Sequence, residues 1–317
     1  MNSLTRTHSR TAWYNISKVV LKGVNHMALM DLKIDFAFKA LFGSPGSEAI
    51  LIAFLNAALK RSGGNAITSV DLINPELGPR YLDDKKSILD IHARTEDGTR
   101  INIEIQLTNR QDMEKRTLYY WSCIFSDQMQ KGMSYSELAQ TITINILNFR
   151  YVRATEAYHT TFHLYEDTDQ FLLTDALEIH FMEIPKLLTN WRKRTVSLHE
   201  DRLVRWLLLL EAAEDDEIRN ELETIAKEDP VMKEAFEKWE DISRDPQALA
   251  EYHSRRMAIL DEASAIREAE LREQRALLEG KREIVKQLIL KGFDIETICE
   301  VSGLSRKEID ELSKHLQ

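Results

Sequence analysis

One acid and a polar triplet on neighbouring strand-like segments have the residue types and spacing for metal-dependent chemistry. In an extended strand alternate side chains share a face, so Asn102, Glu104 and Gln106 point to one side while isoleucines occupy the other. Two carboxylates opposite each other in a sheet repel, whereas Mg²⁺ binds carboxylate oxygens together with phosphate and water. The pattern therefore indicates either a metal site formed by Asp90 and Glu104 or a half-buried strand with its polar side in water.

The loop between the two strands decides whether the two acids meet. A two-residue "DG" loop would place Asp90 opposite Ile105, so that the acids lie on different faces. A three-residue loop at 96–98 instead pairs Asp90 with Glu104 and puts Gly98 in the left-handed conformation that closes such a loop. It also aligns the aliphatic faces of both strands, and a slip of one residue would expose several aliphatic side chains at about 1.5–3 kcal/mol each. Burial therefore favours the three-residue loop.

The surrounding chain predicts an α/β core with a mixed sheet. Its strand-like segments are rich in β-branched residues and bounded by Pro, Gly and Asp. The predicted elements are a helix at 47–61, strands at 66–75, 86–95 and 100–108, a helix at 112–131, a strand at 141–149 and two strands within 161–184. The helix at 112–131 is long enough to make the strands on either side of it parallel.

The chain is predicted to have three parts. They are a basic, disordered N-terminal extension at 1–30, the α/β core at 31–195 and a mostly helical C-terminal region at 196–317. The last part ends in a helix-turn-helix-like segment at 294–315, in which Gly303 separates two helices and Ser305 caps the second. This segment is either a nucleic-acid-binding or regulatory module, or a helical tail through which copies of the chain form a homo-oligomer.

The charge of the chain limits how it could meet nucleic acid. With 317 residues and a formal net charge of −10, its overall field does not attract DNA. A local contact would have to come from Arg110, Lys115 and Arg116, or from the basic cluster at 191–194. Solvated helix and loop positions explain these residues as well.

Membrane and disulfide classes are not indicated. The longest apolar run, at 49–59, is too short to span a bilayer, so no membrane partner is expected. Cys123 and Cys299 show no metal-ligand spacing and read as reduced thiols. We therefore expect a cytoplasmic protein.

Three segments carry a resemblance to a known family. They are "DFAFKALFG", "LDIHARTEDGTRINIEIQ" and "RTLYYWSCIFSDQMQKGMSY". Their order and spacing resemble the Rpn-type recombination-promoting nucleases, also called PD-(D/E)XK nuclease family transposases, over 31–150. The resemblance implies a restriction-endonuclease-like core and a DNA endonuclease that hydrolyses phosphodiester bonds with Mg²⁺, or with Mn²⁺ as a substitute.

The resemblance also assigns roles to single residues. It implies Asp90 and Glu104 as metal ligands and places Gln106 where the wider superfamily usually has a catalytic lysine. Gln106 would position the attacking water but has no charge, so Lys39 or Lys86 would supply a cation near the scissile phosphate.

Two other functions fit the same sequence. The glutamine in place of lysine and the acidic total charge are compatible with a catalytically inactive nuclease-fold protein that binds DNA or acts in regulation. The charged helical stretch at 255–285 is compatible with a helical oligomerisation scaffold.

Overall fold

A computed structural model describes residues 29–73, 90–109 and 112–314 of the chain. The described residues form two compact units, one that ends at Arg256 and one that begins at Met257. The first unit contains α2 (Asp35–Phe42), α3 (Glu48–Ala58), β1 (Val70–Ile73), β2 (Ile91–Thr95), β3 (Arg100–Gln106), α4 (Met113–Asp127), β4 (Thr141–Leu147), β5 (His159–Tyr165), β6 (Leu172–Glu183), α5 (Ile184–Arg192), α6 (Arg202–Leu209), α7 (Asp216–Ala226), α8 (Pro230–Arg244) and the start of α9 (Pro246–Leu290).

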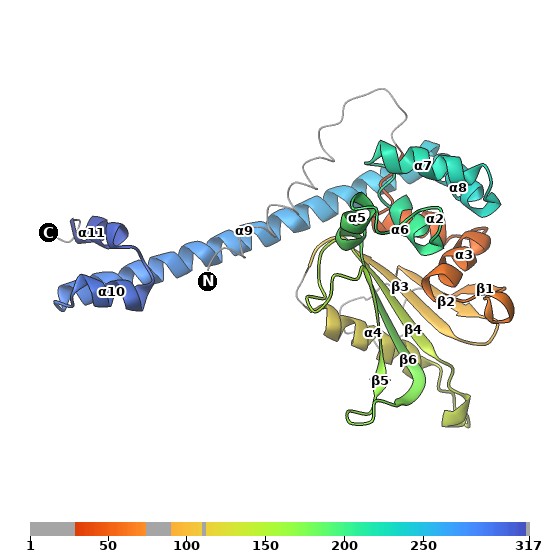
Figure 1. Cartoon of the computed structure of the whole chain (residues 1–317), viewed down its shortest axis with the longest axis horizontal. Coiled ribbons are helices and arrows are strands. Elements are labelled where there is room, and N and C mark those ends of the chain that lie inside the picture. The colour runs from red at the N-terminus through yellow and green to blue at the C-terminus, as the bar shows by residue number, and fades with distance from the viewer. Residues whose placement is uncertain (1–28, 74–89, 110–111, 315–317) are drawn as a thin grey trace. The chain divides into compact units, whose positions relative to one another are not determined.

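The described strands form one mixed sheet of six strands in the order β1-β2-β3-β4-β6-β5 (Figure 1). β1, β2 and β3 pair antiparallel, β3, β4 and β6 run parallel, and β5 returns antiparallel to β6 at the edge. The α/β class with a mixed sheet is confirmed. So is the parallel pairing of β3 and β4, which α4 connects.

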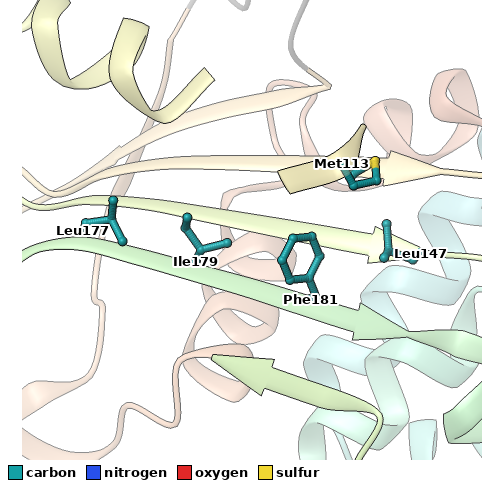
Figure 2. Packing of buried hydrophobic residues seen from close by; sticks show 5 residues of the cluster. All are labelled: Met113, Leu147, Leu177, Ile179 and Phe181. Atoms are coloured by element: carbon teal, nitrogen blue, oxygen red, sulfur yellow. The ribbon is translucent and has the colours of Figure 1, made fainter. Parts of the chain in front are cut away.

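Helices cover both faces of the sheet, and each face has its own character. α4 packs on β3 and β4, where the Thr117 hydroxyl lies 3.3 Å from the Thr143 hydroxyl and 3.2 Å from Asn145 Oδ1. The same face continues in an apolar cluster of Met113, Leu147, Leu177, Ile179 and Phe181 (Figure 2). Buried isoleucines of β3 and β4 form the opposite face, towards α2 and α3. Because every residue of β4 is buried, its near-continuous apolar sequence is explained.

The β2–β3 hairpin has the predicted register. Ile91 pairs with Ile103 and His92 with Asn102, and the Thr95 N–H donates to the Thr99 carbonyl at 3.1 Å. Gly98 has φ = 89°, in the left-handed region. The three-residue loop at 96–98 is therefore confirmed, and it brings Asp90 opposite Glu104.

Two helices were not predicted from the sequence. Residues 35–42 form α2, whose buried Ala37, Phe38, Leu41 and Phe42 follow helical spacing. The dense aromatic pattern hid this periodicity. α5 begins with Pro185 in its first turn, where proline is compatible with a helix. The helix ends at Arg192 and therefore contains the first half of the basic cluster at 191–194.

The second unit is helical, as predicted. The last part of α9 packs with α10 (Ile295–Ser302) and α11 (Arg306–Lys314) around buried Val285, Ile298 and Ile309. Gly303 is left-handed, with φ = 65°, and the Ser305 N–H donates to Glu308 Oε2 at 2.8 Å. The helix-turn-helix-like geometry is present, while a role in DNA binding or oligomerisation stays a prediction.

Two further predictions concern the chain as a whole. Residues 1–28, and the beginning of the strand predicted at 86–95, lie outside the described residues. Among the helices described, none combines the length and apolar character needed to cross a membrane.

Candidate metal centre

Asp90 and Glu104 face each other at the open end of the β2–β3 hairpin. The Asp90 N–H donates to Glu104 Oε1 at 3.4 Å, and the Ile105 N–H donates to Asp90 Oδ2 at 2.8 Å. Glu104 is only 3% exposed, so the polar side of β3 does not face water. The half-buried strand with a solvated polar side is therefore excluded for Glu104.

Donors from three side chains surround the Glu104 carboxylate at long distances. Asn102 Nδ2 lies 3.4 Å from Oε1, and Gln106 Nε2 lies 3.5 Å from Oε2. The guanidinium of Arg116 is 3.6 Å from Oε2. These contacts are longer than ordinary charge-assisted hydrogen bonds, which measure about 2.7–2.9 Å. The carboxylate is therefore only weakly neutralised by the protein.

The two acids hold their protons unusually strongly. Burial, followed by the nearby charge of Asp90, raises the pKa of Glu104 to about 8, although Arg116 opposes the shift. Burial also raises the pKa of Asp90 to about 6, with a further contribution from the charge of Asp35. Two buried carboxylates this close favour a shared proton or a bound cation.

Arg116 is a basic residue that tertiary structure brings beside Glu104. It lies in α4, where its Nη1 donates to Gln106 Oε1 at 3.3 Å and its guanidinium stacks over the Tyr120 ring at 5.3 Å. The adjacent Thr117 anchors α4 to β4 through Asn145, the residue that pairs with Glu104. From sequence, Arg116 was assigned only to phosphate contact or to a solvated helix face. Its position beside Glu104 and Gln106 was missed.

Asp35 is a second residue that sequence reasoning missed. It lies in the first turn of α2, close enough to Asp90 for its charge to raise the pKa of that acid. Asp35 Oδ2 is 2.5 Å from Arg255 Nη2 in α9, so this acid is paired with a cation. The "DFAFK" motif contained it, but only the packing of α2 reveals its proximity to Asp90.

Among the described residues, neither Lys39 nor His92 is hydrogen-bonded to the acid pair. Lys39 lies one helical turn after Asp35 on α2, and its side chain makes no ion pair or hydrogen bond within the described part of the chain. Lys86 lies outside the described residues. His92 pairs with Asn102, and burial with the charge of Arg100 lowers the His92 pKa to about 4, so the ring is neutral.

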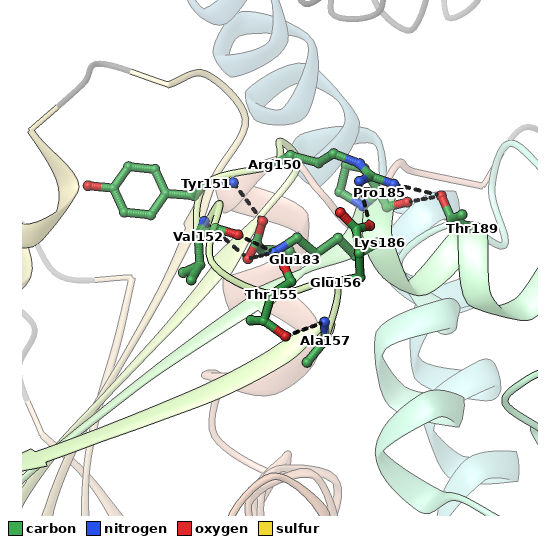
Figure 3. A network of polar contacts seen from close by, with 10 residues as sticks. All are labelled: Arg150, Tyr151, Val152, Thr155, Glu156, Ala157, Glu183, Pro185, Lys186 and Thr189. Atoms are coloured by element: carbon green, nitrogen blue, oxygen red, sulfur yellow. Dashed lines mark hydrogen bonds and ion pairs between the residues drawn. The ribbon is translucent and has the colours of Figure 1, made fainter.

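A hydrogen-bonded clamp formed by Glu183, Lys186 and Tyr151 reaches the first turn of α4. Glu183 accepts hydrogen bonds from the Tyr151 and Val152 N–H groups at 2.6 and 3.3 Å, and Lys186 Nζ donates to the Val152 carbonyl at 2.6 Å (Figure 3). The hydroxyl of Tyr151 in turn accepts the Glu114 N–H at 3.3 Å. The clamp thereby holds the helix that carries Arg116.

The donor set at the pair fits a hard cation. Within the described ranges no cluster of three or more His, Cys, Asp or Glu side chains is arranged to hold a metal. Mg²⁺ does not need one, since it keeps several waters and uses one or two carboxylates with substrate phosphate. The buried Asn102 Oδ1, on the face shared with Glu104, has no hydrogen-bond partner. A buried unpaired oxygen beside two repelling carboxylates is the environment that a small cation would satisfy.

The mixed sheet, with its acid pair at the open end of a hairpin, is consistent with a nuclease-like class of fold. The family model for the PD-(D/E)XK nuclease family transposases matches residues 32–269, which is more than half of the chain. The chain therefore belongs to the PD-(D/E)XK nuclease family transposases, and this membership supports a nuclease-like function in general. Searches of curated proteins and of solved structures find no match.

Proposed function

We propose that the protein is a Mg²⁺-dependent DNA endonuclease of the recombination-promoting, transposase-like kind that hydrolyses phosphodiester bonds. The observation that carries the proposal is the pairing of Asp90 with a buried Glu104 across the hairpin. Like charges opposite each other destabilise a sheet. A function that uses a cation explains why this chain keeps them together.

Asp90 and Glu104 are the proposed metal ligands. When bound, Mg²⁺ would act as a Lewis acid that polarises a phosphoryl oxygen, and Mn²⁺ would substitute for it. Asp90 is the more accessible acid, and its Oδ2 is oriented by the Ile105 N–H. Glu104 lies between Asn102 and Gln106, whose amide groups make long contacts with its two oxygens.

Gln106 and Arg116 share the work that a catalytic lysine does elsewhere in the superfamily. The amide of Gln106 has both a donor and an acceptor, so it can orient an attacking water but cannot offset charge. Arg116, which donates to Gln106 Oε1, supplies a permanent positive charge beside that amide. In the proposed site, Arg116 stabilises the negative charge that develops on the phosphoryl group, and Lys39 on α2 approaches the scissile phosphate as a second cation.

Nicking of supercoiled plasmid in the presence of Mg²⁺ or Mn²⁺ tests this function. We expect wild type to nick and Asp90→Ala and Glu104→Ala each to lose activity by at least about a hundredfold. Asp71→Ala is the matched control, because Asp71 is an exposed acid of neighbouring β1 in a surface ion pair with Arg94, and such pairs contribute little. Undiminished nicking by both variants would remove the assignment of these ligands.

A binding or regulatory protein with an inactive nuclease fold is the second candidate. It is favoured by the arginine beside Glu104, which partly neutralises the acid without a metal. Calorimetric titration with Mg²⁺ and Mn²⁺ distinguishes the two. Binding that Asp90→Ala abolishes supports the nuclease, and absence of binding together with absence of nicking supports the second candidate.

A further inference from the structure

The hairpin of β5 and β6 extends beyond the rest of the sheet. The first residue of β6 that pairs with β4 is Leu177, so residues 172–176 have β5 as their only neighbour among the described strands. The turn between the two strands lies at the end of the sheet away from α5, α6, α7 and α8 (Figure 1). A two-stranded hairpin alone in water is marginally stable, and a further strand or a packed face is needed to hold it. The far end of this hairpin lacks both within the described part of the chain.

Large apolar side chains of this hairpin are exposed. Six of them are between 43% and 70% exposed, namely Phe162, Leu164, Tyr165, Phe171, Leu172 and Leu173. An aromatic side chain has about 150–250 Å² of surface, so the three rings expose about 300 Å² and the leucines raise the total to on the order of 500 Å². The largest apolar patch on an ordinary monomer measures about 300–600 Å² and is often functional. The hairpin therefore has the apolar surface of an interaction site.

β5 is an open edge without the usual protection. It is the outermost described strand on its side of the sheet and pairs only with β6. Natural edge strands are kept short or carry charged residues or proline, which prevent pairing with another chain. β1, at the opposite edge, has four residues, one of which is Asp71 in an ion pair with Arg94. β5 has seven residues and contains no Asp, Glu, Lys, Arg or Pro. A bulge between Phe162 and Leu164 bends the strand, yet its exposed side chains remain able to pack against a further strand.

The charges beyond the two ends of β5 complement each other. Asp167 and Asp169 lie in the turn that follows the strand and are exposed. Lys60 lies beside the other end, since it lines one cavity with His159 and its charge contributes to the lowered pKa of that residue. Neither Lys60 nor Asp167 forms an ion pair within the described residues. In an antiparallel pair of identical strands, the turn of each copy lies beside the His159 end of the other, so these acids meet Lys60.

The same charges argue against nucleic acid or lipid at this surface. Residues 159–183 include several acids and no Lys or Arg, whereas phosphate backbones and anionic membranes are bound by basic side chains. A second copy brings no like charges together along the strand, because β5 itself has none. A second copy of the chain is therefore the partner that this edge fits.

We propose that two copies of the chain associate through their β5 edges, antiparallel about a two-fold axis near Phe162. The pairing covers Phe162, Leu164 and Tyr165 and gives each hairpin the further strand that it lacks. The turn acids of each copy then lie beside Lys60 of the other. The interface is separate from the C-terminal helices and does not depend on nuclease activity.

Sedimentation equilibrium of the full chain tests the proposal at about 1–100 µM protein and about 50 mM salt. We expect a reversible equilibrium between monomer and dimer with a Kd of about 10 µM, because a single strand pair is a small interface. A single species with the chain mass of 36.8 kDa at the highest concentration would overturn the proposal.

A charge on the edge tests which surface is used. Leu164→Lys introduces the kind of residue that protects natural edge strands, and Leu164 is 44% exposed, so we expect circular dichroism and thermal melting to match wild type. The dimer Kd should rise at least about tenfold, since symmetry places the charge in the interface twice. Leu277→Lys, at a 63% exposed position of α9, is the matched control and should leave the Kd unchanged. A dimer lost in Leu277→Lys but kept in Leu164→Lys would assign association to the C-terminal helices and overturn the proposal.

An exchange of charges tests the orientation of the two strands. Asp167→Lys places each turn, now positive, beside Lys60 of the other copy and should weaken the dimer about fivefold at low salt. Lys60→Asp should weaken it similarly, and its backbone φ of 53° is one that Asp tolerates. The double variant Asp167→Lys/Lys60→Asp restores opposite charges and should recover most of the wild-type affinity. A double variant no tighter than either single variant would overturn the antiparallel arrangement.

Discussion

Two buried glutamates at the carboxyl ends of parallel strands are held in opposite ways. Glu183, the last residue of β6, has a lysine 2.7 Å away, and the Glu183 and Lys186 side chains are 0% and 2% exposed. Glu104 of β3 is almost as deeply buried, yet another carboxylate faces it and its nearest cation is 3.6 Å away. Gln106, Leu147 and Glu183 align across the three strands, so both glutamates belong to one end of the sheet.

Glu183 belongs to a structural ion pair with Lys186, whereas Glu104 has no close counter-charge. Lys186 donates to Glu183, Val152 and Thr155, so all three of its hydrogens have acceptors. The carboxylate of Glu104 has only long contacts and a raised pKa. The fold neutralises Glu183 by itself, whereas in the proposed site an external cation would neutralise Glu104.

Removing the Lys186 charge should have the largest effect on stability. Lys186→Met leaves Glu183 buried without a counter-charge, so we expect the free energy of unfolding to fall by about 3–5 kcal/mol. Urea denaturation followed by circular dichroism measures it. The double variant Glu183→Gln/Lys186→Met removes both charges and should recover most of the loss. If the free energy of unfolding of Lys186→Met lay within about 1 kcal/mol of the wild-type value, as for a surface ion pair, Glu183 and Lys186 would not be a structural ion pair that differs from the Glu104 site.

Removing Arg116 should lower activity rather than stability. Arg116→Ala takes away the cation beside Glu104 and Gln106, and we expect the nicking rate to fall by about 10²–10³-fold. Arg116→Lys should keep part of the rate, because an ammonium is charged but cannot reach both partners in a fork. Lys115→Ala, at the exposed neighbouring position, is the control. A nicking rate of Arg116→Ala equal to that of wild type would assign Arg116 to packing alone.

Mg²⁺ should stabilise only a protein with the acid pair intact. At a free concentration of 100 times Kd, binding to the folded state adds about 2.7 kcal/mol to the free energy of unfolding. Thermal melts with Mg²⁺ and with chelator should show this shift for wild type and for Lys186→Met, but not for Glu104→Gln. A shift that survives in Glu104→Gln would place the cation elsewhere.

Neutralising Glu104 in the absence of metal should have the smallest effect on stability, and it should raise the free energy of unfolding, whereas Lys186→Met lowers it. Because the folded-state pKa of Glu104 is raised from 4.5 to about 8, its contribution to stability is full below 4.5 and is lost as pH rises towards 8. In chelator at neutral pH, Glu104→Gln should therefore gain about 0.2–1 kcal/mol and flatten this pH dependence. Denaturation across that pH range measures both, and a loss of stability in Glu104→Gln would show that the charged acid stabilises the fold.

Much of the hairpin could be predicted from its own residues. The alternation around Glu104, the glycine at position 98 and the cost of exposing isoleucines select one register. These constraints act within a few residues of the chain, so the meeting of Asp90 with Glu104 followed from them. The parallel pairing of β3 with β4 followed in the same way from the length of the intervening helix.

The cations around the acids could not be predicted in this way. Arg116 reaches Glu104 because Thr117 bonds Asn145 and the Glu183 clamp holds the start of α4. The approach of α2 depends on residues far along the chain, since Trp239 donates to the Met30 carbonyl at 2.9 Å. No periodic pattern records such contacts between distant segments.

By itself, then, the sequence determined which acids face each other, because strand alternation, turn geometry and burial are local. Tertiary structure alone decided which charges meet those acids. Arg116 and Asp35 each lie on a helix whose position is set by packing against other elements.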